Sequence, residues 1–137
     1  MLLYTTIQSG FPSTDIADKG HVDGAEAAIA LIRSVDWKGV MTTWSETQEG
    51  PLPAIVFLAP AAKAEFYVSH VPMDEAPYDA VHFMQTEKTG WWRSRKTVVT
   101  AEVHSHLLLA QCFADWEAGR WESLKQRLRD QGVNAIG

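Results

Sequence analysis

The sequence predicts an α+β fold: an antiparallel, meander-like sheet of about five to six strands with helices packed on one face. Several short β-rich runs follow one another through the middle of the chain, separated by turn signals, and such neighbours usually pair antiparallel. Helical periodicity precedes and follows these runs, so that helices can cover one face of the sheet. The length of 137 residues predicts a single α+β domain, 1–137, which buries about two-thirds of its unfolded surface.

The first half of the chain is predicted to contain three strands and one helix. Met1–Gln8 is β-rich, and the polar stretch Thr14–Gly24, with two glycines, is predicted to be a loop. Ala25–Val35 has alanine and isoleucine residues at helical spacing, which predicts a helix. Val40–Ser45 is predicted to be a strand, and the continuous apolar run Ala54–Ala59 a central strand.

Three more strands are predicted before the C-terminal helices. Glu65–Val71 alternates in the manner of a half-buried strand, and the proline-bounded acidic segment Pro72–Pro77 forms a loop after it. Ala80–Gln85 is the next strand, and Trp91–Val99 is the last one.

The segment that follows the last strand is predicted to be the helix around which the rest packs. This helix spans Ala101–Ala118, with Thr100 as its N-cap and Gly119 at its end. Its core face consists of apolar residues at three- and four-residue steps: Val103, Leu107, Ala110, Phe113 and Ala114. A second helix is predicted over Trp121–Asp130, where Leu124 and Leu128 lie four residues apart.

Charge and cysteine content restrict the classes of function. The net charge of −5 repels phosphate backbones and disfavours direct nucleic-acid binding. Cys112 is the single cysteine, so no internal disulfide forms, and we interpret it as a small buried apolar residue in a reducing compartment. The start of the chain lacks the pattern of a signal peptide, and no apolar run approaches the length of a membrane span, which predicts a cytoplasmic protein.

The histidines offer an alternative that we consider and set aside. His104 and His106 flank one serine after Glu102, and on a strand both imidazoles could reach one metal ion. JAMM-type zinc peptidases contain such an element, but Ala114 and Glu117 stand where their pattern has serine and aspartate. In a helix, positions two apart point in different directions, and Glu102 and His106 become neighbours instead. We therefore predict no metal, no cofactor and no catalytic residue.

Two other histidines lie on predicted strands. His70 and His82 could neighbour each other across paired strands, where either one could act as a general acid or base. None of the common nucleotide-binding, protease or hydrolase motifs accompanies them.

Aromatic and acidic side chains form the candidate partner-binding surface. Trp91 and Trp92 are adjacent in the last predicted strand and so should point to opposite faces of the sheet, which leaves one of them outside the helix-covered face. If the loops cluster, acidic residues surround these aromatic anchors. The candidate partner-binding residues are Glu46, Glu49, Asp74, Glu75, Asp79, Trp91 and Trp92.

The pattern TAEVHSHLLLAQCFADWEAGRW resembles the closing helix of Imm1-type immunity proteins of bacterial polymorphic toxin systems. The features shared in this pattern are an alanine-rich helix, an aromatic residue, a glycine stop and a tryptophan shortly after. The order of strand, helix, meander and helix, and an acidic single-domain chain without a catalytic motif, are the other two points of resemblance. The resemblance implies a small α+β protein that binds a cognate toxin and occludes its active site. An acidic face would suit a basic toxin that targets nucleic acids.

Two other functions stay open from the sequence. The first is a small enzyme or ligand-binding domain, with a pocket between sheet and helices lined by Trp44, Phe57, Tyr67 and His82. The second is a metal protein that uses the two histidines on either side of Ser105.

Overall fold

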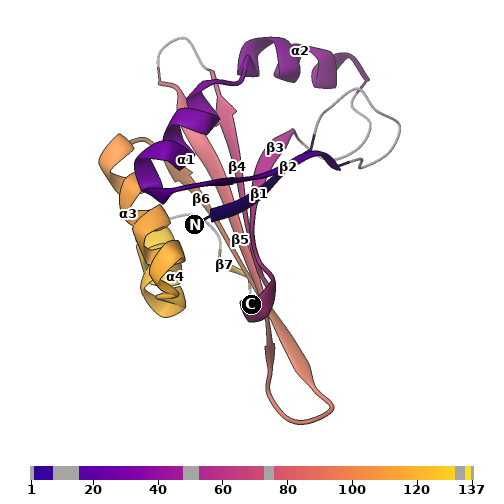
Figure 1. Ribbon diagram of the computed structural model, residues 1–137, viewed down its shortest axis with the longest axis vertical. Helices are drawn as coiled ribbons and strands as arrows, with labels where there is room; N and C mark the ends of the chain where they lie inside the picture. The colour runs from indigo at the N-terminus through magenta and orange to yellow at the C-terminus, as the bar shows by residue number, and fades with distance from the viewer. Residues whose placement is uncertain (1, 8–15, 48–52, 73–75, 132–134, 137) are drawn as a thin grey trace.

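One antiparallel sheet organises the protein. The computed structural model describes residues 2–7, 16–47, 53–72, 76–131 and 135–136 (Figure 1). The strands lie in the order β2-β1-β3-β4-β5-β6-β7. Their bounds are β1 Leu2–Ile7, β2 Ile16–Val22, β3 Ala54–Ala59, β4 Ala64–Val71, β5 Tyr78–Lys88, β6 Ser94–Val103 and β7 Ala135–Ile136. Six longer strands and the two-residue β7 therefore confirm the predicted α+β class.

Four helices pack against this sheet. They are α1 Gly24–Arg33, α2 Trp37–Thr47, α3 His106–Ala118 and α4 Trp121–Arg129. Helices α1, α3 and α4 lie on one face, as predicted, and α2 crosses the end of the sheet near β4 (Figure 1). No helix within the described residues is both long and apolar enough to cross a membrane.

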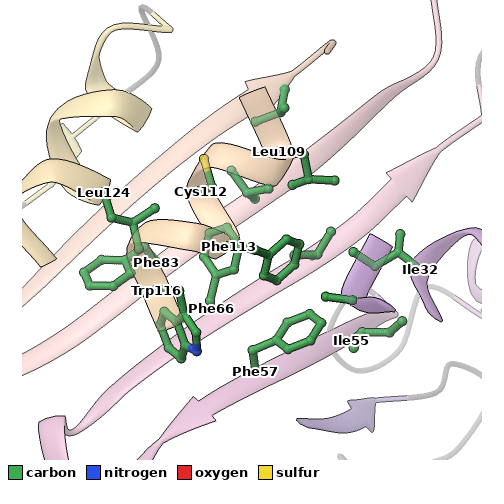
Figure 2. Close-up of a cluster of buried hydrophobic side chains, with 14 of the residues drawn as sticks. Ile32, Ile55, Phe57, Phe66, Phe83, Leu109, Cys112, Phe113, Trp116 and Leu124 are labelled. Carbon is green, nitrogen blue, oxygen red and sulfur yellow. The ribbon is translucent and has the colours of Figure 1, made fainter. Parts of the chain in front are cut away.

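Aromatic rings join helix α3 to the sheet. Phe113 lies edge-on to Phe57, with ring centroids 4.7 Å apart, and to Phe66, at 5.6 Å (Figure 2). Trp116 of the same helix contacts Phe66 and Phe83. The three phenylalanines of the sheet are in register across β3, β4 and β5, which places their rings in one row beneath the helix.

Helix α3 begins later than the sequence predicts, and its buried face differs. Ala101–Val103 continue strand β6, so the N-cap is Ser105, whose Oγ accepts a hydrogen bond from Leu108 N, and not Thr100. The buried residues of the helix are Leu109, Cys112, Phe113, Asp115 and Trp116. Leu107 and Ala114 are exposed, contrary to the prediction, whereas the predicted end at Gly119 is confirmed by its left-handed φ of 71°.

Helix α2 occupies the segment where Val40–Ser45 is predicted to be a strand. Asp36 Oδ1 accepts a hydrogen bond from Gly39 N at the start of the helix, and buried Trp37 donates from Nε1 to Ile32 O at 2.7 Å. The hydroxyl of Thr42 donates to the carbonyl four residues earlier. The Thr42 bond adds little to helix stability, so the capping bond of Asp36 and the anchored Trp37 are what outweigh the β propensity of the segment.

Strand β2 lies where the sequence predicts a loop over Thr14–Gly24, of which the structure describes residues 16–24. Gly20 pairs with Tyr4 of β1, and a Cβ at Gly20 would lie 2.8 Å from Tyr4 Oη. The glycine therefore makes room for the tyrosine ring inside a strand and does not mark a turn.

Cys112 and Asp115 show how the closing helices are held. Burial raises the pKa of the Cys112 thiol to about 12, and its predicted role as a small buried residue is confirmed.

Burial also acts to raise the pKa of Asp115, but hydrogen bonds from Arg127, Arg120 and Ser123 outweigh it and lower the pKa. This carboxylate joins α3 to α4, whose predicted apolar pair, Leu124 and Leu128, is buried.

Candidate functional site

The end of the β5–β6 hairpin projects from the sheet. Strands β5 and β6 pair as far as Lys88 and Ser94, whereas β4 pairs with β5 only as far as Gln85. Residues 86–96 therefore form a two-stranded extension beyond β4, which we call the hairpin arm. Figure 1 shows this arm as the long hairpin at the lower end of the molecule.

The tip of the hairpin arm carries two exposed tryptophans. The sequence predicts Trp91 and Trp92 on opposite faces of a strand, but Thr89 N donates to Arg93 O at 3.1 Å and β6 starts only at Ser94. Both tryptophans consequently lie in the connecting loop. Their exposed fractions are 89% and 75%, and their ring centroids are 5.7 Å apart. Neighbouring exposed side chains of this size are typical of interaction surfaces.

The base of the hairpin arm is tied to the body of the protein. Glu87 Oε1 accepts a hydrogen bond at 3.2 Å from Nζ of Lys125, a buried residue of α4, and Glu87 Oε2 lies 3.7 Å from Arg95 Nη2. Lys125 also pairs with Glu122 at 2.7 Å, and this hydrogen bond lowers the pKa of Glu122. A two-stranded ribbon is only marginally stable alone, so these contacts hold it in position.

The hairpin arm is basic. Four exposed cations follow its strands and loop: Lys88, Arg93, Arg95 and Lys96. Glu87 is its single acid, so the arm carries +3, and the remaining chain carries −8 within a total of −5. The candidate surface predicted from the sequence combines the tryptophans with acidic residues and does not include these cations. The positive charge of residues 88–96, which contain four cations and no acid, is the sequence signal that could have identified this basic surface.

The predicted acidic residues do not surround the tryptophans in the described part of the chain. Glu46 lies on α2, at the opposite end of the molecule from the hairpin arm (Figure 1). Asp79 is expected on a surface loop but lies in β5 and is only 3% exposed. Glu49, Asp74 and Glu75 fall outside the described residues.

Asp79 is the buried member of an ion pair whose other member, Arg33, is partly exposed. Arg33 Nη1 and Nη2 donate to its two carboxylate oxygens at 2.9 Å each, and His70 Nδ1 lies 3.1 Å from Oδ1. The hydrogen bonds to Asp79 raise the pKa of Arg33. The pair links the end of α1 to β5. His70 faces Asp79 in the β4–β5 register, whereas His82 faces Tyr67. The two histidines are therefore not neighbours across the strands, although the sequence allowed that arrangement.

The His104–His106 element has separate partners for its two imidazoles. His104 lies against Tyr78, with ring centroids 5.5 Å apart, and its Nε2 is 3.5 Å from Glu102. His106 Nε2 is 3.1 Å from a carboxylate oxygen of Glu26 on α1. The predicted helical pairing of Glu102 with His106 is wrong because Glu102 lies in β6. Across the described residues, no three potential ligand side chains gather in a metal-binding group.

The face of the sheet opposite α1, α3 and α4 has a pocket of about 280 Å³ beside Tyr67 and His82. The sequence predicts such a pocket between sheet and helices, but Phe57 fills the core on the helix side, and these two residues lie on the other face. Tyr67 Oη donates to Glu65 at 3.1 Å, and mainly burial raises the Tyr67 pKa to about 12. His82 Nδ1 is 3.1 Å from Thr100 Oγ1.

The environment of His82 predicts a dependence of stability on pH. Burial, and secondarily the charge of Lys96, lowers the pKa of His82 below its ordinary value of 6.5. Because the folded protein disfavours the protonated ring, stability is retained above this value and is lost as the pH falls through the lowered pKa. In urea titrations at pH 7.5 and 5.5, His82→Gln should lose less stability on acidification than the wild type. An equal loss in both proteins would contradict the prediction.

Comparisons with protein-family models, curated proteins and solved structures give no significant match. The resemblance to immunity proteins therefore rests on the sequence features given above: the element order, the acidic single-domain composition and the pattern of the C-terminal helix. Among the described residues, Trp91 and Trp92 are the most exposed large apolar side chains, and they lie on a basic projection anchored to the body of the protein.

Proposed function

We propose that this protein is a cytoplasmic, non-enzymatic immunity protein that binds a cognate bacterial toxin and occludes its active site, with the hairpin arm as the element that enters the toxin. The observation that carries the proposal is the exposure of Trp91 and Trp92 at the tip of the arm. Tryptophan and arginine are enriched among the residues that contribute most to protein–protein affinity.

The construction of the hairpin arm supports a binding role. Its two aromatic side chains have few rotatable bonds, so ordering them in an interface costs little conformational entropy. Lys125 and Glu87 hold the base of the arm before any partner arrives. A projection prepared in this way can fill a concave site, and filling the active site of a toxin would exclude its substrate.

Co-expression with a toxin tests the proposal. The toxin encoded next to this gene would be produced in a bacterial host with or without the full-length protein, followed by affinity purification. We expect the protein to restore growth and to copurify with the toxin. A toxic neighbouring product that stays toxic and forms no complex with the folded protein would contradict the proposal.

An assay of toxin activity separates occlusion from other modes of neutralisation. Increasing substrate concentration should overcome inhibition by the protein, because substrate and hairpin arm compete for one site. Inhibition that is independent of substrate would contradict occlusion but leave complex formation intact.

Ligand binding is the second candidate function, favoured by the pocket beside Tyr67 and His82. The pocket of about 280 Å³ is mainly apolar and has the imidazole and the Ser69 side chain at its wall. Screening a fragment library by protein NMR, with His82→Gln as the comparison, would test it. Specific shifts confined to this pocket in the wild type would support ligand binding.

A further inference from the structure

We infer that the site that receives the hairpin arm is an acidic cleft with an apolar floor on the partner protein. This inference rests on the proposed function for the identity of the partner as a protein. The net charge of −5 suggested a basic toxin as the partner, but a basic cleft would repel the positively charged hairpin arm.

The charges of the hairpin arm carry the inference. Lys88, Arg93, Arg95 and Lys96 are all exposed, and none of the tip residues between Thr89 and Trp92 is acidic. The tryptophans therefore approach a partner together with a group of cations. Complementary interfaces bring positive patches against negative ones, and like charges placed face to face cost several kcal/mol.

The single carboxylate of the hairpin arm lies away from the tip, and of these four cations it pairs only with Arg95. Glu87 lies at the base, where one oxygen accepts from Lys125 and the other lies near Arg95. Its charge is used within the molecule to hold the arm. The field beyond the tip is consequently positive.

The shape of the hairpin arm favours a cleft over a flat surface. Three residues of each strand extend past β4, which is roughly 10 Å of ribbon at the usual rise per residue. Two tryptophans at the end of this ribbon can reach an apolar floor while the cations along it meet acidic walls. This arrangement uses all the exposed features of the arm at once.

The charge of the rest of the molecule argues against a polyanion as the partner. Outside the hairpin arm the chain carries −8, which repels the long phosphate backbone of a nucleic acid or an anionic membrane. A compact acidic cleft contacts the arm alone and avoids most of this repulsion.

A selection from a random peptide display library tests the inference without a known partner. The full-length protein would be the bait, and binders that also bind Trp91→Ala/Trp92→Ala would be removed. We expect the remaining peptides to be rich in aspartate, glutamate and apolar residues. Their affinity should fall at least tenfold in Lys88→Glu/Arg93→Glu, which leaves the contact between Arg95 and Glu87 in place. The matched control Lys38→Glu/Arg129→Glu, at two exposed cations elsewhere, should retain binding.

Several outcomes would overturn the inference. These are selected peptides that are neutral or basic, no arm-dependent peptides at all, or arm-dependent binding of single-stranded oligothymidylate or phosphatidylglycerol vesicles in parallel titrations. The co-expression result is independent of this experiment. A toxin complex whose binding site is basic would overturn the inference alone, whereas acidic peptides without any toxin complex would overturn the proposed function alone.

Discussion

Replacing both Trp91 and Trp92 with alanine should weaken the complex with the partner by at least a hundredfold. The two side chains are 89% and 75% exposed in the free protein and have their rings 5.7 Å apart, so one partner surface can bury both. Tryptophans at the centre of an interface contribute about 2 kcal/mol or more each, although such values are not additive. A hundredfold loss of affinity corresponds to about 2.8 kcal/mol of binding free energy, which the two tryptophans together can supply.

Binding kinetics of the purified complex measure this effect. Most of the loss should appear as faster dissociation, because removal of buried apolar contacts acts mainly on the dissociation rate. The same variant should keep its unfolding free energy within about 0.5 kcal/mol, as expected for exposed positions. Toxin protection in the co-expression assay should be lost in parallel.

Leu107→Ala is the matched control for the tryptophan variant. Leu107 is an exposed apolar residue, 66% accessible, on α3 rather than on the hairpin arm. Its truncation should leave affinity unchanged. Equal losses in both variants would show that exposed apolar area in general, and not the arm, drives association. Unchanged affinity in the tryptophan variant would remove the arm from the interface.

The predictions that succeeded depend on local patterns. The continuous apolar run 54–59 corresponds to β3, and the alternating run 65–71 corresponds to β4. Both were predictable because the burial of a strand determines which of its positions are apolar. The helix stop at Gly119 succeeded for a similar reason, since a left-handed residue is a local requirement.

The predictions that failed have two different physical causes. Gly20 looks like a turn residue until Tyr4 is placed across from it. Val40–Ser45 has strand propensity, but Trp37 and Asp36 set up a helix before it. Tyr4 is distant in sequence from Gly20, so no local pattern reveals it, whereas the contacts of Asp36 and Trp37 are local but compete with the β propensity of the residues that follow.

The candidate site was only partly visible in the sequence because part of it depends on contacts between distant residues. The tryptophan pair is conspicuous in the sequence, and its exposure follows from the loop closed between Thr89 and Arg93. The sequence does not reveal that β5 and β6 run past β4, nor that Asp79 turns inward to Arg33. An acidic residue that is close in sequence to the tryptophans, such as Asp79, therefore need not lie on the same surface.

Leu109→Ala should destabilise the protein by about 2–5 kcal/mol, whereas Leu107→Ala should change the unfolding free energy by less than about 0.5 kcal/mol. The two leucines are two residues apart on α3, but Leu109 is fully buried in the core under the helix (Figure 2). Its truncation leaves a cavity that the surrounding structure closes only in part. Urea unfolding of both variants measures the difference, and Leu109→Met, which roughly conserves volume, should cost less than about 1.5 kcal/mol if the alanine variant does not fold.

This pair of leucines also decides which face of α3 is the core face. The sequence pattern that begins at Val103 places Leu107 inside, but Val103 is the last residue of β6 and cannot set the phase of the helix. Counting from Leu109 gives Cys112, Phe113 and Trp116 at steps of three, four and seven residues, which is one helical face. Equal losses from both leucines, or a larger loss from Leu107, would mean that the helix starts before Ser105 and that β6 ends earlier.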